Sequence, residues 1–357
     1  MKIAIDMSPL KTGNFLQHRV RGTGFYLENL KRSFLKYYPE NEYIFFTRGE
    51  KLPNDVDVVH YPYFEPFFLT LPLFSGNKSV VTIHDMTPLV FPNHFKSGLR
   101  GNAKWQIQKM ALQGMKMVIT DSQSSKRDIM KYVGIPEDKI KVVYLAAGSE
   151  FKVLDRRSSI LDLRSKYKLP QEFILYVGDA TWNKNLPRLI EAAIKASVPL
   201  VMIGKALIDK VTDINNPWNK DLLKVQNMIE NQRSKSQDLI TRLGFVSSED
   251  LVALYNVATV FVMPSIYEGF GLPVLEAMSC GCPAVTSKEG SLAEVAGDAA
   301  RIVDPYSVDS IAQGMKEVFG DLALRKELSQ KGLIQAKKFT WDKMAKETMD
   351  VYKSIVL

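Results

Sequence analysis

The stretch YEGFGLPVLEAMSCGCP, residues 267–283, combines residue types that could bind a ligand rich in hydroxyl groups. Glu268 stands directly before a Gly-x-Gly turn, and Glu276 follows eight positions later, about two helical turns further on. Ionised carboxylates accept hydrogen bonds from hydroxyl groups. The spacing therefore suits a ligand that presents two separate sets of hydroxyls along one line.

The residues around the two glutamates predict a strand, a turn and a helix. VFVMPS, residues 260–265, has the apolar pattern of a buried strand, Pro273 suits a first helical turn, and Gly281 suits a helix end. Gly269 and Gly271 leave the backbone of the turn free to approach a ligand closely. The two carboxylates are thus expected at and after a helix N-terminus.

A helix N-terminus in this position favours an anionic ligand. The backbone N–H groups of Phe270, Gly271 and Leu272 would point at an anion such as a diphosphate. Glu268 would then accept hydrogen bonds from the hydroxyls of a group attached to the phosphate. Glu276, about one turn inside the helix, would accept from a pair of ribose hydroxyls.

Other residues give little support for a metal site. The two cysteines, Cys280 and Cys282, are too few for structural zinc and too close for a disulfide, so buried thiols are expected. The Asp55-x-Asp57 pair precedes the strand VVHY, at the wrong end for a ligand site in a parallel sheet. We expect a metal-independent protein, in which cationic side chains and a helix dipole take the place of Mg²⁺.

Short Val/Ile-rich runs alternate with helical segments in both halves of the chain, which predicts parallel α/β sheets. The 357 residues suit two domains of about 150–180 residues each. Residues 148–170 are polar and lack strand character, so the linker is placed there. Ser247 and Ser248 are candidates for the N-cap of a helix. Two doubly wound domains would place a ligand cleft between them, at the carboxyl ends of their strands.

The net charge of +8 is unevenly distributed. Residues 1–164 contain 24 Lys and Arg against 16 Asp and Glu, whereas the remaining residues contain 23 of each. A basic first half suggests an anionic partner, such as a membrane surface, a phosphate-bearing acceptor or nucleic acid, with an ordinary solvated surface as the alternative. The chain shows no secretory signal pattern and no membrane span, so a cytoplasmic protein is expected.

Two features of the first half leave alternatives open. His84 and Asp85 follow the strand SVVTI, at the end of the sheet where ligands bind, which favours a functional role; the alternative is that His84 is hydrogen-bonded within its own loop. YPYFEPFFLTLPLF, residues 61–74, is rich in aromatic residues and proline. This segment is either a loop that covers the core or a surface that faces a lipid or an acceptor.

Around Glu268 and Glu276 the sequence resembles the retaining glycosyltransferases of the GT-B fold, family 4, whose E-x7-E element matches these two glutamates. The resemblance extends through YVGDATWNKNLPRLIEA and the glutamate segment, and more weakly through RGTGFYLENL, VVTIHDMTPLVFP and TDSQSSKRDI. It implies two Rossmann-like domains facing across a cleft. Residues 1–165 would form the acceptor side, with a last helix at 342–357 packing back onto it, and residues 166–341 would bind the nucleotide-sugar donor.

The resemblance also implies roles for individual residues. Glu268 would contact the donor sugar, Glu276 the ribose, Lys184 the diphosphate and His84 the donor sugar from the other domain; Glu268, His84 and Lys184 are the candidate catalytic residues. Gly22 and Gly24 would belong to a glycine loop near the donor phosphates, and Phe245 and Val246 would lie near the base. Many members carry an arginine where this chain has Asp179, which removes one cation from the phosphate site.

The expected activity is transfer of a hexose, with mannose from GDP-mannose as the first choice, to a hydroxyl of a glycan or lipid-linked acceptor in surface polysaccharide synthesis. The anomeric configuration would be retained, no cofactor would be needed, and the inner face of a membrane is a candidate location. A UDP-glucose-type donor and a non-catalytic sugar-nucleotide-binding protein are the alternatives. An NAD-dependent oxidoreductase would need a G-x-G-x-x-G turn, which is absent, and a nucleic-acid-binding role would leave the glutamates unexplained.

Overall fold

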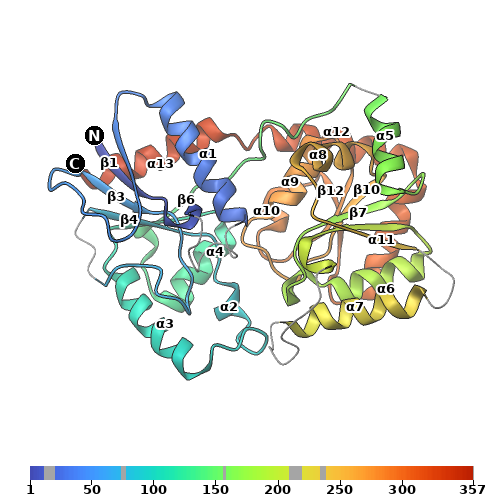
Figure 1. Cartoon of the computed structure of the whole chain (residues 1–357), viewed down its shortest axis with the longest axis horizontal. Helices are drawn as coiled ribbons and strands as arrows, with labels where there is room; N and C mark the ends of the chain where they lie inside the picture. Colours follow the sequence, from blue (N-terminus) through green and yellow to red (C-terminus); the bar gives the residue numbers. More distant parts are fainter. Residues whose placement is uncertain (12–20, 74–77, 156–157, 209–218, 234–238, 357) are drawn as a thin grey trace. The chain divides into compact units, whose positions relative to one another are not determined.

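The computed structural model describes residues 1–11, 21–73, 78–155, 158–208, 219–233 and 239–356. These residues form two units, shown in Figure 1: unit 1 contains residues 1–146 and 339–357, and unit 2 contains residues 147–338. Each unit is built around a six-stranded sheet with helices packed against it. The α/β class that the alternating sequence pattern predicts is confirmed.

The sheet of unit 1 has the strand order β2-β1-β3-β4-β5-β6, and every neighbouring pair is parallel. Its central strand β4, SVVTI, is buried at all five positions, as expected for a β-branched strand that is covered on both faces. The strands are β1 Lys2–Asp6, β2 Glu42–Phe46, β3 Val58–Tyr61, β4 Ser79–Ile83, β5 Met117–Thr120 and β6 Ile140–Val142.

The helices of unit 1 cover both sides of this sheet, with α1 and α13 on one side and α3 on the other in Figure 1. They are α1 Arg21–Tyr37, α2 Thr87–Val90, α3 Gly98–Gln113, α4 Gln123–Asp128 and α13 Trp341–Val356, with the shorter helical segments Ser8–Leu10, Ile129–Val133 and Glu137–Lys139. The last helix, α13, packs against α1, where the rings of Phe25 and Trp341 meet edge to face with centroids 5.7 Å apart.

A buried chain of hydrogen bonds ties α13 to the centre of the sheet. The Tyr352 hydroxyl bonds His60 Nδ1 at 2.7 Å, and His60 Nε2 bonds Thr82 Oγ1 at 2.8 Å. Thr82 Oγ1 also bonds the hydroxyl of Tyr26 on α1 at 3.2 Å. Burial lowers the pKa of His60 to about 3, with a smaller effect of His84, so the His60 ring stays neutral at physiological pH.

The sheet of unit 2 has the order β12-β11-β10-β7-β8-β9, again with all pairs parallel. Its strands are β7 Ile174–Val177, β8 Leu200–Ile203, β9 Ile240–Gly244, β10 Val260–Met263, β11 Ala284–Ser287 and β12 Ala300–Val303. Its helices are α5 Ser158–Tyr167, α6 Leu186–Ala196, α7 Lys220–Arg233, α8 Ser248–Val257, α9 Leu272–Ser279, α10 Leu292–Ala296, α11 Val308–Gly320 and α12 Leu322–Ala336, with short segments Trp182–Lys184 and Lys205–Leu207. Apolar clusters of its described residues pack against both sides of the sheet and form its core.

The division between the units comes earlier in the chain than residue 165, where the sequence places it. Residues 147–155 already belong to unit 2, because Phe151 packs in its core and the Leu154 N–H donates to Asn256 Oδ1 at 2.8 Å. The polar segment that the sequence assigns to a linker also contains helix α5, which packs against α8. Polarity alone therefore did not distinguish a linker from a helix with one buried face, on which Leu163 reaches the core.

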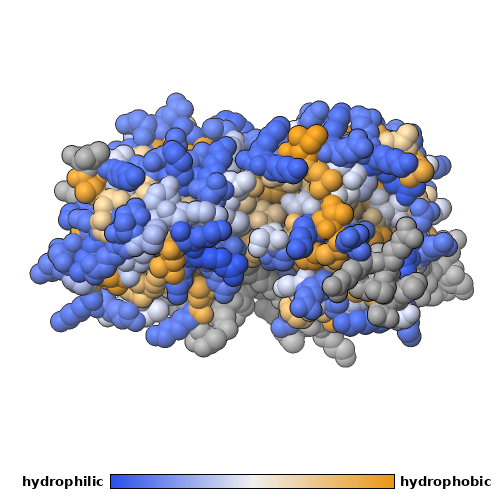
Figure 2. Space-filling view, turned by 90° about the horizontal axis from the view of Figure 1, so that it is seen from above, coloured by the Kyte–Doolittle hydropathy of each residue, from blue (hydrophilic) through white to orange (hydrophobic). Residues whose placement is uncertain are grey.

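One face of the molecule is mostly hydrophilic. Figure 2 shows one face, on which hydrophilic residues predominate and hydrophobic residues form small separate groups. Among the helices that the structure describes, none is long and apolar enough to cross a membrane. Cys280 and Cys282 are both buried as free thiols, as the sequence predicts.

Candidate active site

An ion pair between Lys184 and Glu268 lies at the carboxyl end of the sheet of unit 2. Lys184 Nζ is 2.8 Å from both Glu268 Oε1 and Oε2. The Lys184 side chain is 18% exposed and that of Glu268 is 10% exposed. The two residues, which lie 84 positions apart, are both predicted site residues, and the structure brings them into direct contact.

Asparagines on each side of Lys184 hold its loop against the loop of Glu268. Asn183 Nδ2 donates to the Tyr267 carbonyl at 3.0 Å, and the Ile266 N–H donates to the Asn183 carbonyl at 2.8 Å. Asn185 Nδ2 donates to the carbonyls of Pro264 and Pro305 at 3.0 and 2.6 Å. The segment after β7 and the segment after β10 are thereby connected by backbone-directed bonds that fix where the ion pair forms.

Asn185 has a left-handed backbone conformation, with φ of 60°, which asparagine tolerates better than most residues. This conformation ends the short segment Trp182–Lys184 and starts helix α6. Arg188 on α6 donates to Asn185 Oδ1 at 2.9 Å and lies 6.0 Å from the centre of the Tyr306 ring. The Lys184 segment is therefore braced from its own helix as well.

The other side of the Glu268 loop is held by Gly290 and Ser291. Ser291 Oγ lies 3.0 and 2.7 Å from the carbonyl oxygens of Glu268 and Phe270, between which its one proton is shared, and the Ser291 N–H donates to the Glu268 carbonyl at 3.2 Å. Gly290 has φ of 63°, and a Cβ there would lie 2.6 Å from the Glu268 carbonyl oxygen. A side chain at position 290 would therefore displace the backbone of Glu268.

Helix α9 begins directly after the Gly-x-Gly turn, as predicted. Gly271 is its N-cap, with φ of 100°, and Leu272 is its first residue, followed by Pro273. Because the N-cap is a glycine, it has no side chain with which to cap this helix end. The first N–H groups of a helix have no partner inside the helix, so the end of α9 beside Lys184 is suited to an anion.

Glu276 lies on α9, where its Oε2 accepts a hydrogen bond from the Tyr255 hydroxyl at 2.9 Å. Burial raises the pKa of Glu276 to about 7, because the effect of burial and of the nearby Glu150 exceeds the opposite effect of Tyr255. Tyr255 therefore fixes the position of the carboxyl, and the pKa of about 7 means that the carboxyl gains or loses its charge near neutral pH.

The other predicted residues of unit 2 follow strands β7 and β9 or lie in the Gly-x-Gly turn. Asp179 is exposed after β7, and its carbonyl accepts from the Tyr176 hydroxyl at 2.8 Å. Phe245, which follows β9, is 76% exposed, whereas Val246 is buried in the core. Gly269 lies in the turn next to Glu268.

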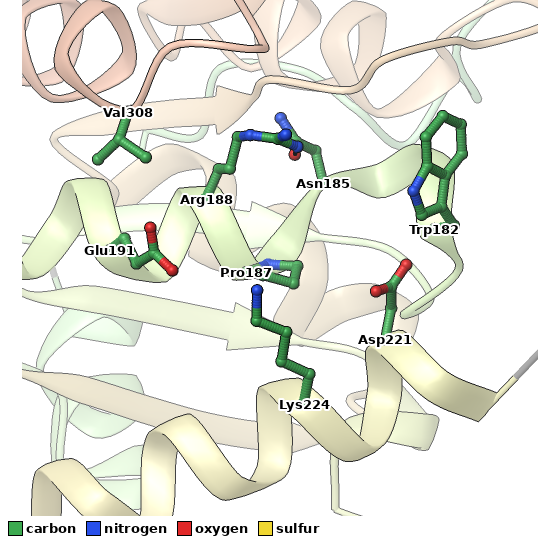
Figure 3. A pocket seen from close by; sticks show the side chains of 8 residues that line it. All are labelled: Trp182, Asn185, Pro187, Arg188, Glu191, Asp221, Lys224 and Val308. Carbon is green, nitrogen blue, oxygen red and sulfur yellow. Dashed lines mark hydrogen bonds between the residues drawn. The ribbon is translucent and has the colours of Figure 1, made fainter. Parts of the chain in front are cut away.

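Figure 3 shows a cavity of about 370 Å³ between α6 and α7 in unit 2. Asp221 and Lys224 on α7 point toward the Trp182 and Pro187 side of it, and Arg188 lies beside Asn185. Among the described residues that line this cavity, none is Lys184, Glu268 or Glu276. The cavity is therefore separate from the ion pair, although it shares the bracing residues Asn185 and Arg188 with it.

In unit 1, Gly22 and Gly24 lie in the first turn of α1, not in the loop that the sequence predicts. A glycine in a helix costs only about 1 kcal/mol relative to alanine, which the burial of α1 residues such as Tyr26 and Leu27 can offset. Residues 12–20 of the expected loop lie outside the described residues. Between the two glycines, the buried Thr23 lines a cavity together with His84.

His84 follows β4 and is held by Asp121, which follows β5. His84 Nδ1 and Asp121 Oδ2 are 2.6 Å apart, and the His84 ring meets that of Tyr26 edge to face at 5.0 Å. Burial alone would lower the pKa of His84, but attraction to Asp121 and their hydrogen bond outweigh it and raise the pKa above 6.5. The Pro62 carbonyl also faces the ring, yet the buried Nε2 has no hydrogen-bond partner of good geometry among the described residues.

Sequence reasoning missed several residues that support these sites. They are Asp121, Asn183, Asn185, Tyr255, Gly290 and Ser291. The asparagines gave a signal, since polar residues flank Lys184 in WNKN, and Asp121 stands at the end of the strand MVIT. Ser291 and Tyr255 gave none, because their partners are distant in sequence.

Comparison with known proteins identifies the family and the fold of the chain. The model of the glycosyl transferases group 1 matches residues 160–334, and that of glycosyltransferase family 4 matches residues 14–147. The fold is also that of sucrose-phosphate synthase from Thermosynechococcus elongatus, with a TM-score of 0.73 at 17% identity over 99% of this chain and 98% of that one. The architecture is therefore the GT-B fold.

Among curated relatives, the O-antigen chain mannosyltransferase B of Escherichia coli is 34% identical over 284 residues, which is 77% of this chain and 70% of the relative. A serotype-specific mannosyltransferase WbdA of Escherichia coli is 31% identical over 78% of this chain, but the match spans only 34% of WbdA. This chain belongs to the group 1 glycosyl transferases, with a family 4 N-terminal half.

The packing of Gly290 against Glu268 can be tested by Gly290→Ala. We expect it to lower the free energy of unfolding by about 1–3 kcal/mol, because the new Cβ combines a strained left-handed backbone with a clash against the Glu268 backbone. The matched control is Gly320→Ala at the end of α11, where a Cβ would meet nothing within 4 Å. Denaturant unfolding of both variants measures the difference, and equal stability of the two would contradict the proposed contact.

Proposed function

We propose that the protein is a retaining hexosyltransferase that moves mannose from GDP-mannose to a hydroxyl of a glycan or lipid-linked acceptor in surface polysaccharide synthesis. The observation that carries the proposal is the Lys184–Glu268 ion pair directly before the N-terminus of α9. The choice of mannose is supported by the names of the relatives, an O-antigen chain mannosyltransferase and serotype-specific mannosyltransferases.

The ion pair can serve a sugar and a phosphate together. An ammonium group has three N–H donors, and Lys184 directs bonds at the two Glu268 oxygens, which leaves it able to donate to a phosphate oxygen. Each oxygen of Glu268 can accept a further bond from a sugar hydroxyl. Lys184 would thus orient the carboxylate that binds the sugar and stabilise the charge that develops on the departing diphosphate.

In the proposed transfer, the bond between the anomeric carbon and the diphosphate oxygen breaks as the acceptor oxygen bonds to the same face of that carbon. The acceptor proton passes to the leaving phosphate. The positive charge comes from Lys184 and the N-terminus of α9, without a divalent cation.

Release of nucleotide from a panel of GDP- and UDP-sugars, with and without EDTA, tests the donor and the need for a metal. We expect slow hydrolysis of GDP-mannose that EDTA leaves unchanged and that falls at least tenfold in Glu268→Gln. Glu230→Gln, on the exposed side of α7, is the control and should retain full activity. Release from UDP-glucose alone would favour the alternative donor, and sugar-nucleotide binding without hydrolysis or transfer would favour a non-catalytic binding protein.

The pKa of Glu276 predicts how donor affinity depends on pH. Ribose hydroxyls donate to the ionised carboxylate, so affinity should rise with pH through about 7, as Glu276 loses its proton. We expect calorimetry to show several-fold tighter binding of GDP-mannose at about pH 8 than at about pH 6. GDP-mannose suits this measurement because its diphosphate is esterified at both ends, so the charge of the ligand stays constant between about pH 6 and pH 8. The Glu276→Gln variant should bind GDP-mannose weakly, with an affinity that does not depend on pH. If its affinity rose with pH as steeply as that of the wild type, a role of Glu276 in binding the ribose would be contradicted.

Peripheral contact with an anionic membrane is a further part of the proposal. Leu99 and Met110 on α3 are 90% and 62% exposed, and the same helix carries Arg100, Lys104 and Lys109. Exposed apolar residues next to cations favour an anionic lipid surface. We expect cosedimentation with anionic but not with neutral vesicles, and weaker binding of Leu99→Ser; equal binding to both vesicle types would contradict it.

A further inference from the structure

Two adjoining cavities between α6 and α7 in unit 2 form one groove, called the α6–α7 groove below. The first, of about 370 Å³, lies near the first turns of both helices (Figure 3). The second, of about 380 Å³, lies further along the same helices beside Ile194 and Met228, and Glu191 lines both cavities. From Pro187 to Lys195 the groove follows α6 for about 12 Å, at about 1.5 Å per residue. A groove of this length suits an extended ligand.

Four charged side chains line the first cavity: Arg188 and Glu191 on α6, and Asp221 and Lys224 on α7. Glu191 and Lys224 are exposed, and the other two are half-buried. Among the described residues, the side chains of Glu191, Asp221 and Lys224 have no hydrogen-bond or ion-pair partner. Arg188 donates to Asn185 Oδ1 through Nη1 and carries further N–H donors. The wall therefore offers hydrogen-bond donors and acceptors that the described protein groups do not use.

The charges of this wall cancel, because two cations stand with two carboxylates. An anion would be attracted by one pair and repelled by the other, whereas a hydroxyl can accept from the cations and donate to the carboxylates. The helix ends nearby offer little to a phosphate. Pro187 in the first turn of α6 has no N–H group, and at the start of α11 the Ser310 N–H already donates to Ser307 Oγ. The wall therefore suits a neutral ligand rich in hydroxyl groups.

The apolar residues of the groove belong largely to the core. Ile194, Met228 and Val308 are half-buried and pack against the apolar cluster of unit 2 that lies under α6. A groove that docks a helix of a partner protein needs an exposed apolar surface, which these residues do not provide. The half-buried Trp182 and Pro187 add ring surfaces at one end of the groove, which suit the C–H face of a sugar. This combination favours a carbohydrate over a protein partner.

We propose that the α6–α7 groove binds a segment of the neutral glycan that the enzyme extends, at a site separate from the transfer site. Among the described residues that line its two cavities, none is Lys184, Glu268 or Glu276. A second attachment point keeps the glycan near the enzyme and raises the local concentration of its reacting end. The inference rests on the proposed function, because a glycan is the product of that reaction.

Methyl NMR of the full chain tests whether a glycan enters the groove. Methionine and valine methyl groups are labelled, and an α-linked mannohexaose is titrated without any donor. We expect the methyl signals of Met228 and Val308 to shift with one common, saturating dependence on its concentration. No shift at millimolar mannohexaose would overturn the proposal. Shifts caused instead by inorganic phosphate, or by a higher protein concentration alone, would indicate an anion site or a contact between copies and would also overturn it.

Variants locate the contact in the groove. Lys224→Met should weaken the affinity for the mannohexaose about tenfold, because hydrogen bonds to a charged group are lost, and Asp221→Asn is a second variant read in the same way. Arg188 is left unchanged because it braces Asn185. Lys326→Met, at an exposed lysine on α12, is the matched control and should bind like the wild type. Equal affinities of the Lys224 and Lys326 variants would overturn the proposal.

Transfer assays separate the groove from the transfer site. With mannohexaose as acceptor, Lys224→Met should raise the acceptor KM about fivefold and leave kcat and the donor KM unchanged. With methyl α-mannoside, which is too short to occupy both sites at once, the same variant should behave like the wild type. An equal rise of the KM for both acceptors would place the groove in the transfer site and overturn the proposal.

Failure of the proposed function would look different. Donor binding and slow donor hydrolysis are measured on the wild type without any glycan. Their presence, together with methyl signals that mannohexaose does not shift, would overturn only the groove proposal. Their absence for every donor would overturn the proposed function itself, whatever the methyl signals show.

Discussion

The Lys184–Glu268 ion pair is the interaction on which the candidate active site of unit 2 depends. Both side chains are largely buried, so each charge requires the other, and removal of one partner from such a pair typically costs about 3–5 kcal/mol. The surrounding hydrogen bonds keep the pair in a single geometry: Asn183 and Asn185 hold the lysine segment, and Ser291 holds the glutamate segment. The contacts are directed at backbone atoms, so the site is specified by the ends of three parallel strands and not by the side chains of one loop.

In unit 1, one histidine lies on strand β3 and another directly after its neighbour β4, and the two have different hydrogen-bond partners. His60 is buried, neutral and bonded on both ring nitrogens, and it links the last helix of the chain to β4 through Tyr352 and Thr82. His84, two residues beyond Thr82, is paired with the Asp121 carboxylate and is one of the residues that line a cavity. The C-terminal helix therefore supports the strand whose end carries the candidate catalytic histidine.

Much of the fold and part of the site could be predicted from the sequence, and the limits have physical reasons. The strand, the Gly-x-Gly turn and the helix around Glu268 could be predicted because the local sequence pattern determines them. Ser247 also caps α8, as the sequence predicts. The partners of these residues could not be predicted. Ser291 bonds to the backbone carbonyl of Glu268, and because every residue type has this group, the sequence does not reveal the contact. Strand β12, with the sequence ARIV, was not recognised because it is short, lies at an edge and exposes its arginine.

The most direct test of this account is a double-mutant cycle on donor affinity, with Lys184→Met, Glu268→Gln and the double variant measured by calorimetry with GDP-mannose. The account predicts that each single change weakens binding and that the two effects are not additive, with a coupling energy of about 0.5–3 kcal/mol, as for residues in contact. Changes that add within about 0.5 kcal/mol, or single variants that bind the donor as tightly as the wild type, would contradict a donor site organised by this ion pair.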